Sequence, residues 1–357
     1  MAKVRIGYVG CGFMAQKVHI PNLLSLPECE LVALAEVRGE LGKRVQARHG
    51  IPNLYPDHRA LAEDKSVRAV AVSGHFAGQG EIAIDLLRAG KDVFMEKPMA
   101  VSGEQAERIL AAEKEGRHRL MVGYMKRYDA GNLLVKELVD GFRQSGELGG
   151  LTYIRNHGFC GDWLGGLDTH LEQTDEPMPP PPDAPFPCWM PKRFHDRYVG
   201  YLQQYTHNIN LVRWLLDDAH TVTVRAVDLN EGDGASGVVV LDVSGVRTVI
   251  ESGSVAYHGW EEHTQIYFEK GWVRTAAPPL LLRNVPADVE VYKSGEGSVL
   301  SKHFPPDGWT WSYKEELRHF IECVRDGKPF RSPACDAIAD VRTIEKIYET
   351  FVTDVDG

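Results

Sequence analysis

Val4-Arg5-Ile6-Gly7-Tyr8-Val9-Gly10-Cys11-Gly12-Phe13-Met14-Ala15 is the stretch that decides the fold. Its apolar first half predicts a buried strand, and the glycines that follow predict a tight turn directly into a helix. Gly10 permits the turn and Gly12 lets backbone approach a ligand, while the first helical amides point the positive end of the helix dipole at an anion. The stretch therefore predicts a cradle for the pyrophosphate of a dinucleotide, formed by Gly10, Gly12, Phe13 and Met14.

The next apolar run, Leu31 to Ala35, ends in an acid, Glu36. An acid at about this spacing from the glycine turn hydrogen-bonds the adenosine ribose and repels a 2′-phosphate, which favours NAD as the cofactor. Arg38, two residues further on, could stack on adenine or meet a phosphate, so NADP stays open as an alternative.

Up to Tyr124 the sequence alternates short apolar runs with helical patterns, which predicts a doubly wound parallel sheet over residues 1–124. Further strands are expected at 67–72, 92–95 and 120–124. A helix over 81–89 should end at Gly90, and Ser102 with Gln105 should form a capping box at the start of another.

Residues 125–357 change in texture. A helix around 130–139 is followed by β-rich runs at 221–228, 237–243, 246–255, 263–269 and 271–274, with turns at 230–234 and 270–271. These runs are too close together for crossover helices, so they predict an antiparallel sheet. Helices over 313–325 and 335–351 close the chain. The fold class is therefore α/β, with a second α+β domain after the first.

A proline-rich insertion, residues 177–191, interrupts this plan. Its prolines exclude a helix and require extended or looped chain. Two interpretations are open. The insertion is either a disordered surface segment or an ordered flap over the active site, the second favoured by Phe186, Trp189 and Met190.

The net charge of −10 argues against nucleic acid or an anionic membrane surface as the main partner. The sequence shows neither a long apolar span nor a secretory leader, so we expect a cytoplasmic protein. The six cysteines have no Cys-x-x-Cys pair and the histidines lack metal-ligand spacing, so we predict reduced cysteines and no catalytic metal.

Glu96-Lys97-Pro98 follows the predicted strand at 92–95, at the sheet edge where ligands bind in such folds. A shielded lysine beside a cationic nicotinamide ring has its ammonium form disfavoured and could exchange protons near neutral pH. Lys97 is therefore a candidate catalytic residue, and the whole triplet is a candidate cofactor contact.

Together with Tyr124-Met125-Lys126-Arg127-Tyr128-Asp129 and His207-Asn208-Ile209-Asn210-Leu211, these motifs resemble the Gfo/Idh/MocA oxidoreductase family over nearly the whole chain. That family contains glucose-fructose oxidoreductase, inositol dehydrogenases and related sugar enzymes. It joins a Rossmann domain to an open-faced antiparallel sheet domain that binds substrate and forms oligomers. The resemblance implies a homo-oligomer, dimer or tetramer, with Lys97 at the catalytic centre. It further implies a cis bond between Lys97 and Pro98, and cofactor contacts at Ser73 and His75.

The family's second catalytic motif, Asp-x-Gly-x-His-x-x-Asp at the start of a helix, is altered here. His207 is kept, but Gln203, Tyr205 and Asn210 replace the two acids and the glycine. An amide can orient an imidazole but adds no negative charge, so His207 should be a weaker base unless an acid from elsewhere reaches it. The acids considered are Asp162, Asp168 and Asp196.

These observations predict an NAD(P)-dependent oxidoreductase acting on a secondary alcohol or ketone of a sugar, glycoside or cyclitol. Lys97 and His207 share the proton transfer, and either could be the immediate carrier. Two alternatives stay open: a regulatory sensor that binds dinucleotide without turnover, and an enzyme that retains NAD and uses it reversibly within one turnover. Candidate substrate contacts are Lys97, Arg127, Tyr128, Asp162, Trp163, Trp189, Gln203 and His207, with Arg127 also a candidate cofactor contact.

Overall fold

The computed structural model describes residues 3–164, 170–217, 222–257, 259–306 and 308–356. The chain divides into two compact units. The first unit contains Met1–Tyr124, Asp168–Pro187 and Tyr313–Val341, and the second contains Met125–Leu167, Cys188–Ser312 and Arg342–Gly357. The longest stretch of the first unit ends at Tyr124, and neither unit is one continuous stretch.

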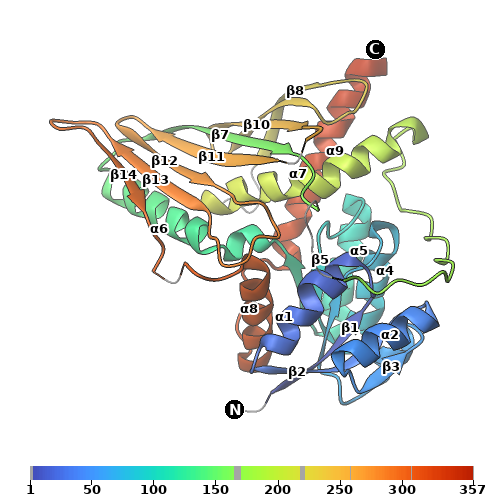
Figure 1. Cartoon of the computed structure of the whole chain (residues 1–357). Helices are drawn as coiled ribbons and strands as arrows, with labels where there is room; N and C mark the ends of the chain where they lie inside the picture. The colour runs from blue at the N-terminus through green and yellow to red at the C-terminus, as the bar shows by residue number, and fades with distance from the viewer. Residues whose placement is uncertain (1–2, 165–169, 218–221, 258, 307, 357) are drawn as a thin grey trace. The chain divides into compact units, whose positions relative to one another are not determined.

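The first unit is built on a six-stranded sheet with the order β3-β2-β1-β4-β5-β6, every pair of which is parallel. Its strands alternate with helices along the chain (Figure 1). This is the doubly wound arrangement that the alternating pattern predicts. The strands are β1 (Val4–Val9), β2 (Cys29–Ala35), β3 (Asn53–Tyr55), β4 (Ala69–Val72), β5 (Asp92–Glu96) and β6 (Leu120–Gly123).

The helices of this unit begin and end largely where local chemistry predicts. Ser102 caps its helix by accepting the amide of Gln105, whereas the Gln105 side chain accepts Val101 N–H, so the reciprocal half of the capping box is displaced by one residue. Gly90 ends its helix with a φ of +81°, but that helix begins earlier than predicted. The elements are η1 (Ala15–His19), α1 (Ile20–Ser25), α2 (Gly39–His49), α3 (His58–Ala62), α4 (Phe76–Arg88), α5 (Gly103–Gly116) and α8 (Ser312–Asp326).

The second unit contains an eight-stranded sheet with the order β14-β13-β12-β11-β7-β10-β9-β8. All neighbours are antiparallel except β10 and β7, so the predicted sheet is mainly antiparallel. Helices α6 (Ala130–Ser145) and α7 (His195–Leu215) pack on one of its faces, as Figure 1 shows. The strands are β7 (Leu151–Cys160), β8 (Val222–Leu229), β9 (Gly237–Val243), β10 (Val246–Ser254), β11 (Trp260–Phe268), β12 (Gly271–Ala276), β13 (Asp288–Lys293) and β14 (Val299–His303).

Several of these elements were not predicted. Strand β7 has the polar side chains of Arg155, Asn156 and His157 in its middle, which hide the alternation expected of a strand. Strands β13 and β14 were missed, helix α7 was expected only from the resemblance and with a later start, and α6 runs further than expected. The remaining elements are η2 (Met125–Tyr128), η3 (Lys192–Phe194) and α9 (Ala334–Asp356). Among the described residues, none of the helices combines the length and apolarity needed to cross a bilayer.

Candidate active site

The glycine turn of the first unit has the geometry of a phosphate cradle. Gly10 has a φ of +100°, and a Cβ there would lie 2.6 Å from the carbonyl oxygen of Ser73. Only glycine fits this position. At Gly12, by contrast, an added Cβ would meet no described atom within 4 Å, so the backbone faces open space. The side chains of Phe13 and Met14 beside it are half-buried. The turn therefore leaves room for a ligand beside Gly12, and its contact with a pyrophosphate stays a prediction.

Glu36 links this turn to the end of β2. Its side chain is almost fully buried and accepts the amide of Cys11 at 2.7 Å. It also accepts the amide of Arg38 at 3.1 Å and the Nε–H of that arginine at 2.7 Å. Two backbone amides and the Arg38 guanidinium thus occupy the acceptor positions of the Glu36 carboxylate. Arg38, which the sequence left free to meet a phosphate, is thus paired with Glu36.

Lys97 follows β5 and is held by its neighbours through the backbone. The Glu96 carboxylate accepts the Lys97 amide at 3.1 Å. Gln79 of α4 donates to the carbonyl oxygens of Glu96 and Pro98, at 3.0 and 2.6 Å. The bond between Lys97 and Pro98 is cis, as the resemblance implied. The lysine side chain is half-buried, so this segment presents a partly shielded amine at the carboxyl end of the sheet.

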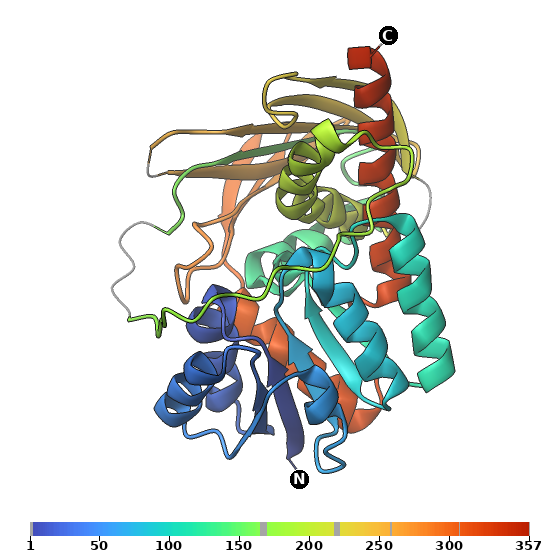
Figure 2. The same ribbon diagram turned by 90° about the vertical axis from the view of Figure 1, so that its right-hand side faces the viewer.

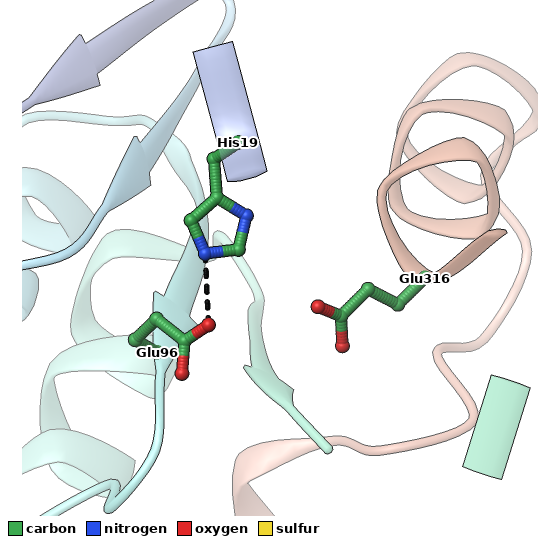
Figure 3. A group of neighbouring side chains, drawn as sticks. All are labelled: His19, Glu96 and Glu316. Atoms are coloured by element: carbon green, nitrogen blue, oxygen red, sulfur yellow. Dashed lines mark hydrogen bonds and ion pairs between the residues drawn. The ribbon is translucent and has the colours of Figure 1, made fainter. Parts of the chain in front are cut away.

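Two side chains that the sequence did not single out lie beside Glu96. His19 Nε2 and Glu96 Oε1 are 2.8 Å apart, and Glu316 of α8 points toward this pair, as Figure 3 shows. The ligating atoms of all three lie within 4.8 Å of one another. His19, Glu96 and Glu316 lie far apart in the sequence, so no local pattern indicates that they meet. The one available signal is that Glu316 lies within the predicted helix at 313–325.

Glu316 has the opposite environment to Glu36. Its side chain is fully buried, and among the described residues no donor reaches either of its oxygens. Burial, reinforced by the charge of Glu96, raises the pKa of Glu316 well above its usual value. Nitrogen and carboxylate groups of this kind also suit a divalent cation. The raised pKa of Glu316 favours its neutral acid form, which needs no cation.

In the second unit, His207 lies in the interior of α7, because that helix already begins at His195. The expected place at a helix start is therefore wrong. Its side chain is buried, with 6% exposed. Asn210, one turn further on, accepts the Nε–H of Arg127 at 2.7 Å. The amide that replaces the family's acid thus binds a guanidinium group from η2. Because Lys97 and His207 belong to different units, their approach stays a prediction.

A buried polar network surrounds this part of α7. Asn208 donates to Asn156 of β7 at 2.8 Å and to Glu262 of β11 at 3.1 Å. Glu262 forms an ion pair with Lys126, and Asn156 donates to Thr264 at 2.7 Å. Turning α7 about its axis would break these hydrogen bonds and leave buried polar groups without partners, which is costly. The network therefore fixes the rotation of α7. Sequence reasoning missed it, although Lys126 and Asn208 lie within the quoted motifs.

The other candidates are placed unevenly. Tyr128 is buried, Trp163 is half-buried, and Asp162, Trp189 and Gln203 are exposed. Asp196 lies three turns earlier on α7, about 16 Å along the axis from His207, and therefore does not support that imidazole. Asp168 lies outside the described residues.

The two predicted cofactor contacts after β4 already have partners. Ser73 Oγ accepts the Tyr8 hydroxyl at 2.7 Å, and His75 caps α4 through Nδ1 while its ring packs on Phe76. Both residues follow the carboxyl end of β4, as expected. Whether either contacts a nucleotide stays a prediction.

Comparison with known proteins shows what this chain is similar to. Residues 4–124 match the family model described as an oxidoreductase family with an NAD-binding Rossmann fold. The chain is 25% identical over 338 residues to a myo-inositol 2-dehydrogenase of Thermotoga maritima, covering 91% of this chain and 90% of that protein. It is 26% identical over 276 residues to an inositol 2-dehydrogenase of Salmonella typhimurium, covering 75% of this chain and 72% of that protein.

Solved structures agree in fold. A 3-ketoreductase from Actinomadura kijaniata in complex with NADP superposes with a TM-score of 0.72 at 20% identity, covering 98% of each chain. An aldose-aldose oxidoreductase from Caulobacter crescentus gives a TM-score of 0.73 at 20% identity, covering 98% of this chain and 97% of that one. The glycine turn, the acid at the end of β2 and the Glu-Lys-Pro segment all lie within residues 4–124, the part of the chain that matches the oxidoreductase family model.

Proposed function

We propose that this chain transfers a hydride between nicotinamide and a secondary alcohol or ketone of a sugar, glycoside or cyclitol. The observation that supports this most strongly is the clamped segment at Lys97. The side chains of Glu96 and Gln79 hydrogen-bond the backbone around Lys97. The Lys97 side chain therefore extends from a rigid backbone at the carboxyl edge of the sheet. When bound, the nicotinamide supplies the hydride acceptor or donor.

We propose that Lys97 hydrogen-bonds the reacting oxygen of the substrate and exchanges its proton. In the reductive direction, the ammonium form would stabilise the developing alkoxide.

His207 is the second candidate proton carrier, but its surroundings argue for a lesser role. Asn210 gives it no negative charge, and the oxygen of that amide already accepts from Arg127. A neutral amide bound to a cation cannot stabilise an imidazolium as a carboxylate does. We therefore propose Lys97 as the main proton carrier and His207 as a group that positions the substrate.

The names of the relatives give the first substrate to try. The two curated relatives described above are inositol 2-dehydrogenases, so we propose a cyclitol or a related sugar ring, oxidised at one secondary hydroxyl. Half-buried Trp163 and the buried Arg127 are candidate partners for the ring face and the hydroxyls. We further propose a homo-oligomer located in the cytoplasm.

The test is incubation of the purified protein with NAD or NADP and a panel of cyclitols, aldoses and glycosides. Formation of reduced nicotinamide is followed by its absorbance. Turnover with free cofactor supports the proposal. Nucleotide released only on denaturation, with substrates oxidised and reduced in pairs, supports the retained-cofactor mode. Binding of nucleotide with no turnover across the panel favours a sensor and contradicts the enzyme.

A further inference from the structure

A segment without regular secondary structure, residues 170–187, belongs to the first unit and is called here the strap. In Figure 2 it runs in yellow-green across the blue part of the chain. It is fastened next to the glycine turn by a pair of hydrogen bonds. Gln16 donates to the carbonyl oxygen of Glu172 at 3.1 Å, and the Glu172 amide donates back to the Gln16 side chain at 2.8 Å.

Further contacts extend the strap from α2 to α4. Arg44 and Arg48 of α2 donate to the carbonyl oxygens of Gln173 and His170, each at 3.0 Å. At the other end, Pro182 packs so closely on α4 that a Cβ added to Gly78 would lie 3.3 Å from its ring. The strap therefore crosses the carboxyl ends of the strands, where a dinucleotide binds in this fold. The interpretation of the proline-rich segment as ordered chain is favoured for its part up to Pro187.

Glu176, which lies just before the prolines, makes the most specific of these contacts. Its two carboxylate oxygens accept the amides of Glu40 and Leu41, each at 2.9 Å, and one also accepts the Thr174 hydroxyl at 3.2 Å. These amides belong to the first turn of α2, an eleven-residue helix whose N-terminus attracts anions. The hydrogen bonds from these two amides, the Thr174 hydroxyl and the charge of Arg38 lower the pKa of Glu176. The strap thus places an ionised carboxylate at the start of α2.

A 2′-phosphate on the adenosine ribose would need the same groups. In this fold a nearby arginine and the amides after the second strand accommodate that phosphate in NADP enzymes. Here Glu36 holds the Arg38 guanidinium, and Glu176 holds the α2 amides. Two carboxylates and one guanidinium leave a net negative charge facing an incoming dianion.

We propose that Glu176 is a specificity-determining residue, an anion supplied by the chain itself that takes the place of a 2′-phosphate and restricts the nucleotide to NAD. This rests on the proposed function only in that the first unit binds a nicotinamide dinucleotide. It extends the role of Glu36 to a residue on a different segment, 140 positions later in the sequence. The absence of a carboxylate at 176 should therefore admit NADP without harming NAD.

The test compares equilibrium binding of NAD and NADP to nucleotide-free wild type and Glu176→Gln, with heat or protein fluorescence as the signal. Glutamine keeps the size of the side chain and one acceptor but removes the charge. We expect NADP affinity to rise by about tenfold or more, the size of one charge-assisted contact, while NAD affinity stays within about threefold.

Glu172→Gln is the matched control. Glu172 lies on the same strap and loses the same charge, but its carboxylate pairs with Arg48, away from the first turn of α2. It should leave both affinities unchanged. Equal gains for NADP in the two variants would mean a general charge effect and would overturn the proposal, as would an unchanged NADP affinity in Glu176→Gln.

A second measurement on the unmodified protein uses fragments of the nucleotides. AMP should compete with NAD, and adenosine 2′,5′-bisphosphate, which differs from AMP only by the 2′-phosphate, should compete much more weakly. Equal competition by both fragments overturns the role of Glu176. If the wild type binds neither NAD nor NADP, the proposed function itself fails, which is a different outcome.

Discussion

Two groups of acids in the first unit have opposite surroundings. At the adenosine end, Glu36 and Glu176 accept backbone amides, and Glu36 also pairs with Arg38. Beside Glu96 and His19, Glu316 is fully buried with no donor among the described residues. The first arrangement stabilises a fixed negative charge, and the second stabilises a neutral acid. Hydrogen bonds from backbone amides lower the pKa of Glu176, whereas burial raises the pKa of Glu316.

The largest effect is expected from Lys97→Met, which keeps the length of the side chain but removes the amine. Turnover should fall by about a thousandfold, within the range for loss of a general acid or base, while NAD binding stays nearly constant. The measurement is steady-state kinetics with the best substrate of the panel, with NAD titrated separately. Lys114→Met, at an exposed position of α5, is the control and should be fully active. Activity in Lys97→Met near that of the control would remove Lys97 from the mechanism.

A second buried acid, Glu113, tests whether burial favours the neutral form. Burial raises the pKa of Glu113 to about 7, although its carboxylate accepts a hydrogen bond from the Leu120 amide. The pKa of Glu113 is higher in the folded protein than in the unfolded chain. The protonated side chain therefore stabilises the fold fully below pH 4.5, and this contribution to the unfolding free energy is lost as the pH rises through 7. The wild type should lose up to about 3 kcal/mol of unfolding free energy across this window.

Glu113→Gln should remove that loss and be the more stable protein at pH 8, as measured by urea unfolding at several pH values. Glu115→Gln, on the same helix at an exposed pair with Arg88, should leave the pH dependence unchanged. Parallel pH curves for wild type and Glu113→Gln would contradict the assignment.

A smaller loss is expected from Glu36→Gln, which tests the fixed-charge half of the comparison. The amide cannot neutralise Arg38, and its own NH₂ group faces N–H donors. We expect about 2 kcal/mol less stability, the cost of disrupted charge-assisted hydrogen bonds, and weaker NAD binding. The readouts are urea unfolding and calorimetric titration. Unchanged stability would mean that the bonds to Cys11 and Arg38 contribute little.

The smallest effect is expected from Glu316→Gln, because glutamine resembles the protonated acid in size and charge. Unfolding free energy at pH 7 should change by less than about 1 kcal/mol, in contrast to Glu36→Gln. Metal analysis of the purified wild type is the companion measurement. A large loss of stability in Glu316→Gln, together with a stoichiometric divalent cation in the wild type, would show that Glu316 is an ionised ligand.

The first sheet, the glycine cradle and Glu36 could be predicted because their signals are local: a strand, a turn and a helix within a few residues. The partners of these residues could not. Glu176 precedes the proline run, and nothing near it in the sequence indicates that it caps α2. Glu316 with His19, and Lys126 with Glu262, join residues from distant elements. Strand β7 was hidden for a related reason, since its buried Asn156 is satisfied by side chains from β11 and α7.

The most direct test of the central claim, that the turn from Gly10 to Met14 with Glu36 holds a nicotinamide dinucleotide, is calorimetric titration of nucleotide-free protein with NAD. We predict saturable binding of one NAD per chain, with NADP binding much more weakly. No binding of either nucleotide, by protein whose unfolding transition shows it to be folded, would contradict the account.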